Sequence, residues 1–174
     1  MSNKRQLRGR NLFLLCLLIT LLALPFIIEN AYALMVKIPL EELTKKANYI
    51  LIGKVKNMRC AWNPESTLIY TYVTVSVERY IKNILDKKEV PKEVTIRYVG
   101  GIVGDIGLWQ SDTPTFKGNQ QVLLFLQPIE KGIFKVTGRF QGKYTIEKDR
   151  ILEKGVSVNH FVNQIKRIIE SQKK

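Results

Sequence analysis

The feature that most restricts the fold is a two-residue alternation of apolar and polar side chains in LIYTYVTVSVERYI, residues 68–81. Val73, Val75 and Val77 alternate with threonine, serine and glutamate, which places the valines on one face of an extended chain. A helix would spread these valines around its circumference, because its period is 3.6 residues. The segment therefore predicts a β-strand with one buried face and one face in water.

Five further segments have the composition of strands. They are YILIGKV, EVTIRYV, VLLFL, IFKVTGRF and GKYTI, at residues 49–55, 93–99, 122–126, 133–140 and 142–146. The unbroken apolar run VLLFL is typical of a strand that is covered on both faces. Residues 57–67, NMRCAWNPEST, are rich in loop-forming residues, so we expect a loop there.

Two amphipathic segments at the ends of this β-rich region predict helices. One covers residues 38–48, and the other covers 159–171 with Ser157 or Asn159 as its N-cap. Six short strands in one open sheet would leave exposed edges, and closure into a barrel removes them. We therefore predict a mainly β fold with flanking α: a small antiparallel OB-like barrel of five to six strands with an N-terminal and a C-terminal helix.

An export signal precedes this region. Residues 1–33 combine a basic start, a leucine-rich apolar run and the tripeptide AYA, whose Ala31 and Ala33 are the small residues that a signal peptidase reads. The apolar run is at the lower limit of length for crossing a bilayer, so an uncleaved membrane anchor is the alternative. We expect a protein exported across the cytoplasmic membrane, secreted or anchored by this segment, with residues 34–174 as its single exported domain.

The net charge points to the kind of partner. The chain carries +13, and removing the four basic residues and the one acidic residue of the first 33 positions leaves +10. A positive field of this size favours anionic partners. We expect an anionic envelope polymer or another envelope protein, and no nucleic acid. The alternative is a lysine-rich surface that is merely solvated.

Basic residues of the strands are expected to share the outer face of the barrel. The candidate binding residues are Lys54, Lys56, Arg97, Lys135, Arg139 and Trp109, with Lys143 as a further candidate. Tyr70 and Tyr72 lie on the polar side of their strand and offer surfaces for stacking. Trp109 ends the glycine-rich segment 100–109, which we expect to form a contact surface.

That glycine-rich segment follows a strand, as phosphate-binding loops do. Such a loop needs a helix directly after the glycines, because the helix N-terminus supplies the amides that hold phosphate. The residues that follow here, LWQSDTPTFKGNQ, contain proline and turn formers instead. We therefore interpret Gly100 and Gly101 as a sharp bend and Gly104 and Gly107 as parts of a hairpin tip.

The sequence offers no reaction centre. Cys60 and His160 are the only cysteine and histidine after residue 33, and a structural zinc site needs four such ligands. We expect no catalytic residue, no metal, no cofactor and no enzymatic activity. The alternatives are an envelope hydrolase with an unrecognised carboxylate site and a membrane-tethered accessory subunit.

Several segments carry a resemblance to known proteins. ANYILIG, the alternating strand with its exit VERYIKN, and FKGNQQVLLFL lie between residues 47 and 126. They resemble exported bacterial proteins of unknown function. They also look like a remote, cysteine-poor relative of netrin-like domains, the OB-type barrels seen in tissue inhibitors of metalloproteinases. Those inhibitors reach the protease zinc with an N-terminal cysteine, whereas the expected mature terminus here is Leu34, so the resemblance implies a fold and not inhibition.

Overall fold

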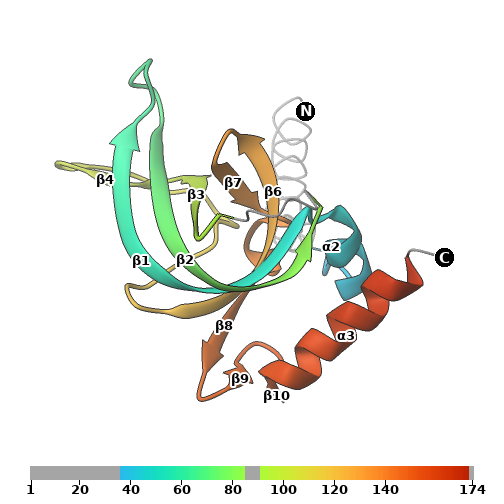
Figure 1. Ribbon diagram of the computed structural model, residues 1–174. Coiled ribbons are helices and arrows are strands. Elements are labelled where there is room, and N and C mark those ends of the chain that lie inside the picture. The colour runs from blue at the N-terminus through green and yellow to red at the C-terminus, as the bar shows by residue number, and fades with distance from the viewer. Residues whose placement is uncertain (1–35, 85–90, 173–174) are drawn as a thin grey trace, which may run out of the picture. The chain divides into compact units, whose positions relative to one another are not determined.

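Five strands close into a ring through hydrogen bonding, as the computed structural model of residues 36–84 and 91–172 shows (Figure 1). They are β1 (Tyr49–Trp62), β2 (Ile69–Asn83), β3 (Glu93–Val99), β6 (Gln121–Glu130) and β7 (Ile133–Val136). Their order is β1-β2-β3-β7-β6, and β6 pairs back with β1. The mainly β fold and the small OB-like barrel are confirmed. The predicted signal segment 1–33 lies outside the described residues.

The ring differs from the prediction in one respect, because it is not wholly antiparallel. Strands β3 and β7 run parallel, with Thr95 opposite Ile133 and Ile96 opposite Phe134, while the other four pairs in the ring are antiparallel. Five is an odd number, so strand direction cannot alternate all the way around a closed ring. One parallel pair is the geometric consequence of closure.

Two hydrophobic cores lie on opposite sides of β1 and β6. Leu51 and Val55 face the barrel interior, where they pack with Val73, Val75 and other buried residues of the ring. The alternate residues of β1 and β6 pack beneath the helices instead; they include Ile50, Ile52, Leu123 and Phe125. Residues 122–126 are all fully buried, which explains the unbroken apolar run that predicted this strand.

The two flanking helices are α2 (Leu40–Lys46) and α3 (Val158–Ser171). The Ser157 hydroxyl accepts a hydrogen bond from the His160 amide at 3.2 Å, so Ser157 is the N-cap of α3. Phe161 in the first turns of α3 packs edge-on against Tyr144, with ring centroids 4.9 Å apart. Both predicted helices are confirmed, and each covers the second core.

A hairpin leaves the barrel directly after β3. It consists of β4 (Gly101–Val103) and β5 (Ile106–Leu108), and it projects from the side of the barrel in Figure 1. Gly100 and Gly101 have φ angles of +116° and +133°, which L side chains rarely adopt. The chain therefore bends at these two glycines into a strand, and not into the helix that a phosphate-binding loop needs.

The remaining elements follow β7. They are the 3-10 helix η1 (Arg139–Gly142), β8 (Lys143–Glu147), β9 (Arg150–Ile151) and β10 (Val156–Ser157). Strand β8 pairs with β6 outside the ring and carries the sheet towards α3.

Two local predictions are wrong. Residues 57–62 are not a loop, because β1 continues through them and pairs with β2 as far as Trp62 opposite Ile69. The strand expected at 133–140 ends at Val136, since positive φ angles at Gly138 and Arg139 turn the chain into η1. Thr137 is consequently buried.

Candidate functional site

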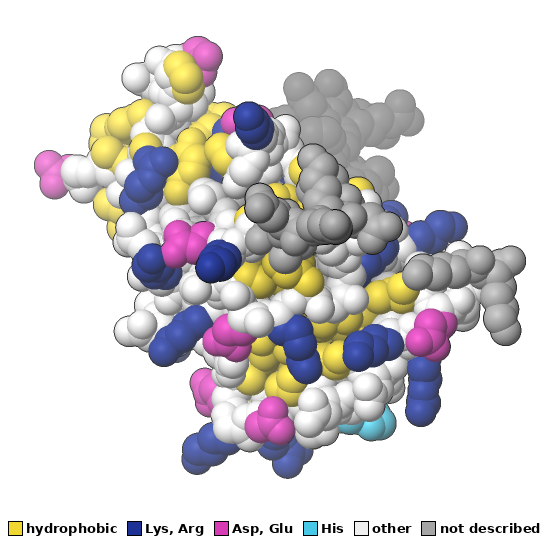
Figure 2. All heavy atoms as spheres, in the orientation of Figure 1, with side chains coloured by type: hydrophobic (Ala, Val, Ile, Leu, Met, Phe, Trp, Pro, Cys, Tyr) yellow, Lys and Arg dark blue, Asp and Glu magenta, His cyan; other side chains and the backbone are white. Residues whose placement is uncertain are grey.

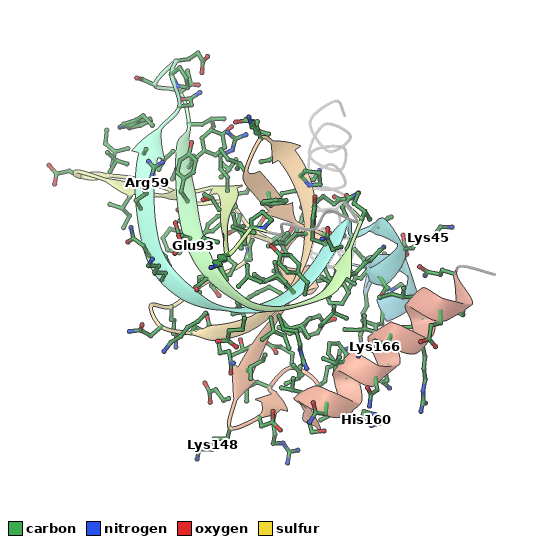
Figure 3. All side chains as sticks on the ribbon, in the orientation of Figure 1. Lys45, Arg59, Glu93, Lys148, His160 and Lys166 are labelled. Atoms are coloured by element: carbon green, nitrogen blue, oxygen red, sulfur yellow. The ribbon has the colours of Figure 1, made fainter. Side chains whose placement is uncertain are left out.

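The outer half of β1 brings a guanidinium group onto the outer wall of the barrel. A β-bulge between Val55 and Asn57 changes the pairing register, after which Arg59 lies directly opposite Tyr72 of β2. The Arg59 guanidinium carbon is 4.3 Å from the Tyr72 ring centroid, which is a cation–π contact. Figure 3 labels Arg59 on this part of β1.

A second arginine makes the same kind of contact one step along the wall. Arg97 on β3 lies opposite Tyr72 in the pairing, and its guanidinium carbon is 4.8 Å from the centroid of the Tyr70 ring. The Tyr70 and Tyr72 rings meet edge to face with centroids 6.5 Å apart. We call Arg59, Tyr70, Tyr72 and Arg97 the arginine–tyrosine face.

The charged form of Arg97 is stabilised by its neighbours. Partial burial opposes the charged form, but hydrogen bonds to Glu130 and Tyr72 outweigh it and raise the pKa of the guanidinium above its ordinary value. The Arg97 Nη2 atom is 2.7 Å from Glu130 Oε1. Arg97 therefore tethers the β6–β7 turn to the face, whereas Arg59 forms none of the ion pairs found among the described residues.

The predicted basic residues do not gather into one continuous patch. Lys56 on β1 pairs with Glu93 at 2.6 Å, and Arg139 on η1 pairs with Asp112 at 3.0 Å. Lys135 is exposed on β7, and the Trp109 side chain that follows β5 is 86% exposed. Arg97 is thus the predicted residue that contributes to the arginine–tyrosine face, together with the two tyrosines noted for stacking.

The remaining predicted lysine, Lys54, lines a polar cleft with a volume of about 810 Å³. The cleft lies between the segment 115–121, strand β8 and the turn at residues 152–153. Lys117 and Lys143 also line it, and so do Glu78, Glu147 and Glu153. We call this the lysine cleft.

Sequence reasoning missed two parts of these sites. Arg59 was placed in an expected loop, and only its pairing with β2 shows that it faces outward beside Tyr72. Lys117 lies in the segment before β6, and no local sequence pattern links it to Lys54 or Lys143. The alternation of β2 did identify the outward position of Tyr70 and Tyr72, which are partly exposed between buried neighbours.

Part of the exposed apolar surface lies at and near the hairpin. Ile102 and Ile106 are more than half exposed, and Met58 of β1 is 40% exposed. Figure 2 shows hydrophobic side chains gathered over the outer ends of β1 and β2, with Lys or Arg side chains beside them. Met58 lies opposite the core residue Val73, whereas Arg59 lies opposite Tyr72, so their side chains are on opposite faces of β1.

The structure separates Cys60 from His160, so they cannot act together as a thiol–imidazole pair. Cys60 follows Arg59 on β1, and its sulfur is 3.4 Å from the Thr71 hydroxyl oxygen. His160 is exposed in the first turn of α3, at the opposite end of the domain from Arg59 in Figure 3. Among residues 36–84 and 91–172, no three His, Cys, Asp or Glu side chains are grouped as metal ligands would be. Over the same residues, no helix has the length and apolar character needed to span a bilayer.

Fold and surface together define a small five-stranded barrel with an aromatic and cationic outer wall. No protein-family model matches the sequence, and none of the curated proteins is significantly similar to it.

Proposed function

We propose that this protein is an exported, non-enzymatic binding domain that holds an anionic polymer on the outer wall of its barrel. The observation that carries the proposal is the arginine–tyrosine face, in which two guanidinium groups and two aromatic rings share the outer wall of the barrel. Arg59 is exposed there, and Arg97 and the two tyrosines are partly exposed. Aromatic faces stack on the rings of a polymer's units, while guanidinium groups bind its negative charges.

The position of this face supports the proposal by analogy. OB-fold barrels bind oligosaccharides and oligonucleotides on the face of their second and third strands and on the adjacent loops. Tyr70, Tyr72 and Arg97 lie on β2 and β3, and Arg97 is tied to the β6–β7 turn through Glu130. Fold analogy alone does not assign a ligand, so the argument depends on the side chains themselves.

We also propose that the protein is exported and that its barrel is of the netrin-like type. The basic, apolar and small-residue parts of segment 1–33 support export, and an exported domain meets acidic glycans and other envelope polymers. The five-stranded ring supports the netrin-like resemblance drawn from ANYILIG and FKGNQQVLLFL.

Binding to polygalacturonate, an acidic glycan, tests the function against dextran, a neutral one. The affinity for polygalacturonate should fall steeply as salt rises, because charge–charge attraction is screened. The substitution Arg59→Gln should lower the affinity several-fold more than Arg167→Gln on α3, although both remove one exposed positive charge. Equal losses for the two variants, or no binding at low salt, would contradict the proposal.

One observation favours a second candidate function, hydrolysis of such a polymer. The lysine cleft is also lined by three glutamates, Glu78, Glu147 and Glu153. Glycoside hydrolysis uses a pair of carboxylates. Incubation with polygalacturonate should then release new reducing ends, and Glu153→Gln or Glu78→Gln should abolish the release. If no reducing ends appear while binding is retained, this candidate is removed.

A further inference from the structure

The lysine cleft has a fixed wall, because its loop is hydrogen-bonded to the barrel. The Val55 amide donates to the Gln120 carbonyl at 2.8 Å, and the Asn119 amide donates to the Val55 carbonyl at 3.1 Å. Within the loop, the Lys117 amide donates to the side-chain oxygen of Gln120 at 3.0 Å. The Gln120 side-chain nitrogen in turn donates to the Thr145 hydroxyl on β8, so the loop and β8 are joined across the cleft.

Lys143 is the cation held most firmly in this cleft. Its Nζ donates to the Thr145 hydroxyl oxygen at 3.1 Å and lies 5.6 Å from the centroid of the Phe116 ring. Burial lowers the pKa of Lys143; the carboxylate of Glu153 opposes the shift, and the charge of Lys117 adds to it. Two ammonium groups therefore repel each other in the free protein, and an anion between them would relieve that repulsion.

Within the part of the chain that the structure describes, no carboxylate forms an ion pair with a lysine of the cleft. Lys54, Lys117 and Lys143 form none of the ion pairs found among the described residues. Glu153 is engaged elsewhere, since both of its oxygens accept the Thr145 amide, at 2.8 and 2.9 Å. The cleft thus offers ammonium groups that no ion pair occupies, beside three glutamates that balance their charge.

The other lining groups restrict what the anion can be. Three glutamates share the cleft and would repel a doubly charged phosphate more than a singly charged carboxylate. The same carboxylates, with the carboxamides of Asn119, Gln120 and Gln121, are acceptors and donors for hydroxyl groups. A small ligand that combines one carboxylate with several hydroxyls matches both sets of groups.

We propose that the lysine cleft binds a sugar that carries a carboxylate, with the carboxylate between Lys117 and Lys143 and the ring hydroxyls facing the carboxamides and glutamates. The inference rests on the proposed function, because it names the acidic unit of the polymer. The cleft and the arginine–tyrosine face are connected along β1, whose outer side carries Lys54, Lys56 and Arg59 in succession.

Three probes that differ only at the sixth carbon test the inference by calorimetry on the full chain. They are glucuronate, glucose and glucose 6-phosphate. We expect glucuronate to bind at least tenfold more tightly than glucose and more tightly than glucose 6-phosphate. Glucose binding as tightly as glucuronate, or glucose 6-phosphate binding most tightly, would overturn the inference.

Variants locate the site. Lys117 is exposed, so Lys117→Gln leaves the core unchanged and the variant should fold as the native protein does. We expect it to lose glucuronate affinity about tenfold because the charge is removed, and not because the domain unfolds. Lys166→Gln on α3 removes the same charge far from the cleft and should leave the affinity unchanged. Lys143→Met should give a loss at least as large as that of Lys117→Gln. Equal affinities for the Lys117 and Lys166 variants would refute the site.

The substitution Arg59→Gln separates this inference from the proposed function. This variant should bind polygalacturonate more weakly and bind glucuronate with unchanged affinity, because Arg59 is outside the cleft. Polymer binding without glucuronate binding would refute the cleft alone. Glucuronate binding without polymer binding would refute the function of the face.

Discussion

The Arg59 guanidinium carbon lies 4.3 Å above the Tyr72 ring, and the two residues are directly paired across β1 and β2. The contact exists because the bulge after Val55 places Arg59 outward, on the same side as the tyrosines of β2. A cation–π contact at an exposed site contributes about 0.5–1 kcal/mol. Its larger consequence is that it holds the guanidinium group over an aromatic surface before any ligand arrives.

Replacing Tyr72 tests whether that aromatic surface binds a ligand. We expect Tyr72→Ala to lower the affinity for polygalacturonate five- to tenfold, since stacking on one ring contributes about 1 kcal/mol or more. Tyr72→Phe keeps the ring and therefore its stacking contribution, so its affinity for polygalacturonate should stay within about twofold of that of the native protein. Both variants lose the hydrogen bond between Arg97 and the Tyr72 hydroxyl, so their difference isolates the ring. If the two bind alike, the ring has no part in binding.

Gly53 is expected to contribute to the stability of the barrel, because the structure leaves no room for a side chain there. A Cβ atom at this position would lie 2.5 Å from the Ser76 carbonyl oxygen and 2.7 Å from a methyl carbon of Val75. Gly53→Ala should therefore lower the free energy of unfolding by about 2 kcal/mol, which urea denaturation measures. At Gly118, no atom lies within 4 Å of such a Cβ, so Gly118→Ala is the matched control and should change stability by less than about 0.5 kcal/mol.

Tyr144 makes stability depend on pH in the alkaline range. Burial, assisted by the charge of Glu153, raises the pKa of Tyr144 to about 12 from its ordinary value of 10.0. The unfolded chain loses this proton first, so the stabilisation is complete below pH 10 and is lost as pH rises towards 12.

Comparison of Tyr144→Phe with the native protein isolates this effect. The native protein should lose about 2 kcal/mol more than the variant between pH 9 and about pH 11.5 in urea titrations. Tyr70→Phe, which alters a ring on the outer wall, should behave like the native protein. Parallel pH dependence of the native and Tyr144→Phe proteins would show that this hydroxyl is not buried as described.

Processing of the N-terminal segment is directly measurable. We expect the exported product to begin at Leu34, so its mass should lack residues 1–33. Ala33→Arg should block cleavage, because the peptidase accepts small residues at that position. An exported product that retains residues 1–33 in the native sequence would instead support the membrane anchor.

The strands that were predicted correctly are those whose own side chains alternate or are uniformly apolar. In β2, each valine faces one core and each neighbour faces solvent, so two-residue periodicity and structure coincide. In β6, successive residues enter different cores, which is why an unbroken apolar run still forms one strand. Such local patterns carry enough information to define the class of fold.

The outer half of β1 could not be predicted, because its strand conformation comes from a partner. Residues 57–62 contain asparagine, arginine and cysteine without a clear period, and they are extended since β2 pairs with them. Arg59 was therefore missed, and so was the arginine–tyrosine face. The lysine cleft was missed for a similar reason. Its lysines come from β1, from the segment before β6 and from β8, which only ring closure and the β6–β8 pairing bring together.

The pairing of β1 changes along its length. Residues 49–54 are hydrogen-bonded to strands on both sides, whereas beyond residue 56, within the described part of the chain, the ladder runs to β2 only. Local opening needs less free energy where a strand has one neighbour than where it has two. Arg59 is thus carried by a segment of the wall that adjusts easily to an arriving chain, whereas Tyr70 and Tyr72 are held on β2, which is paired with both β1 and β3.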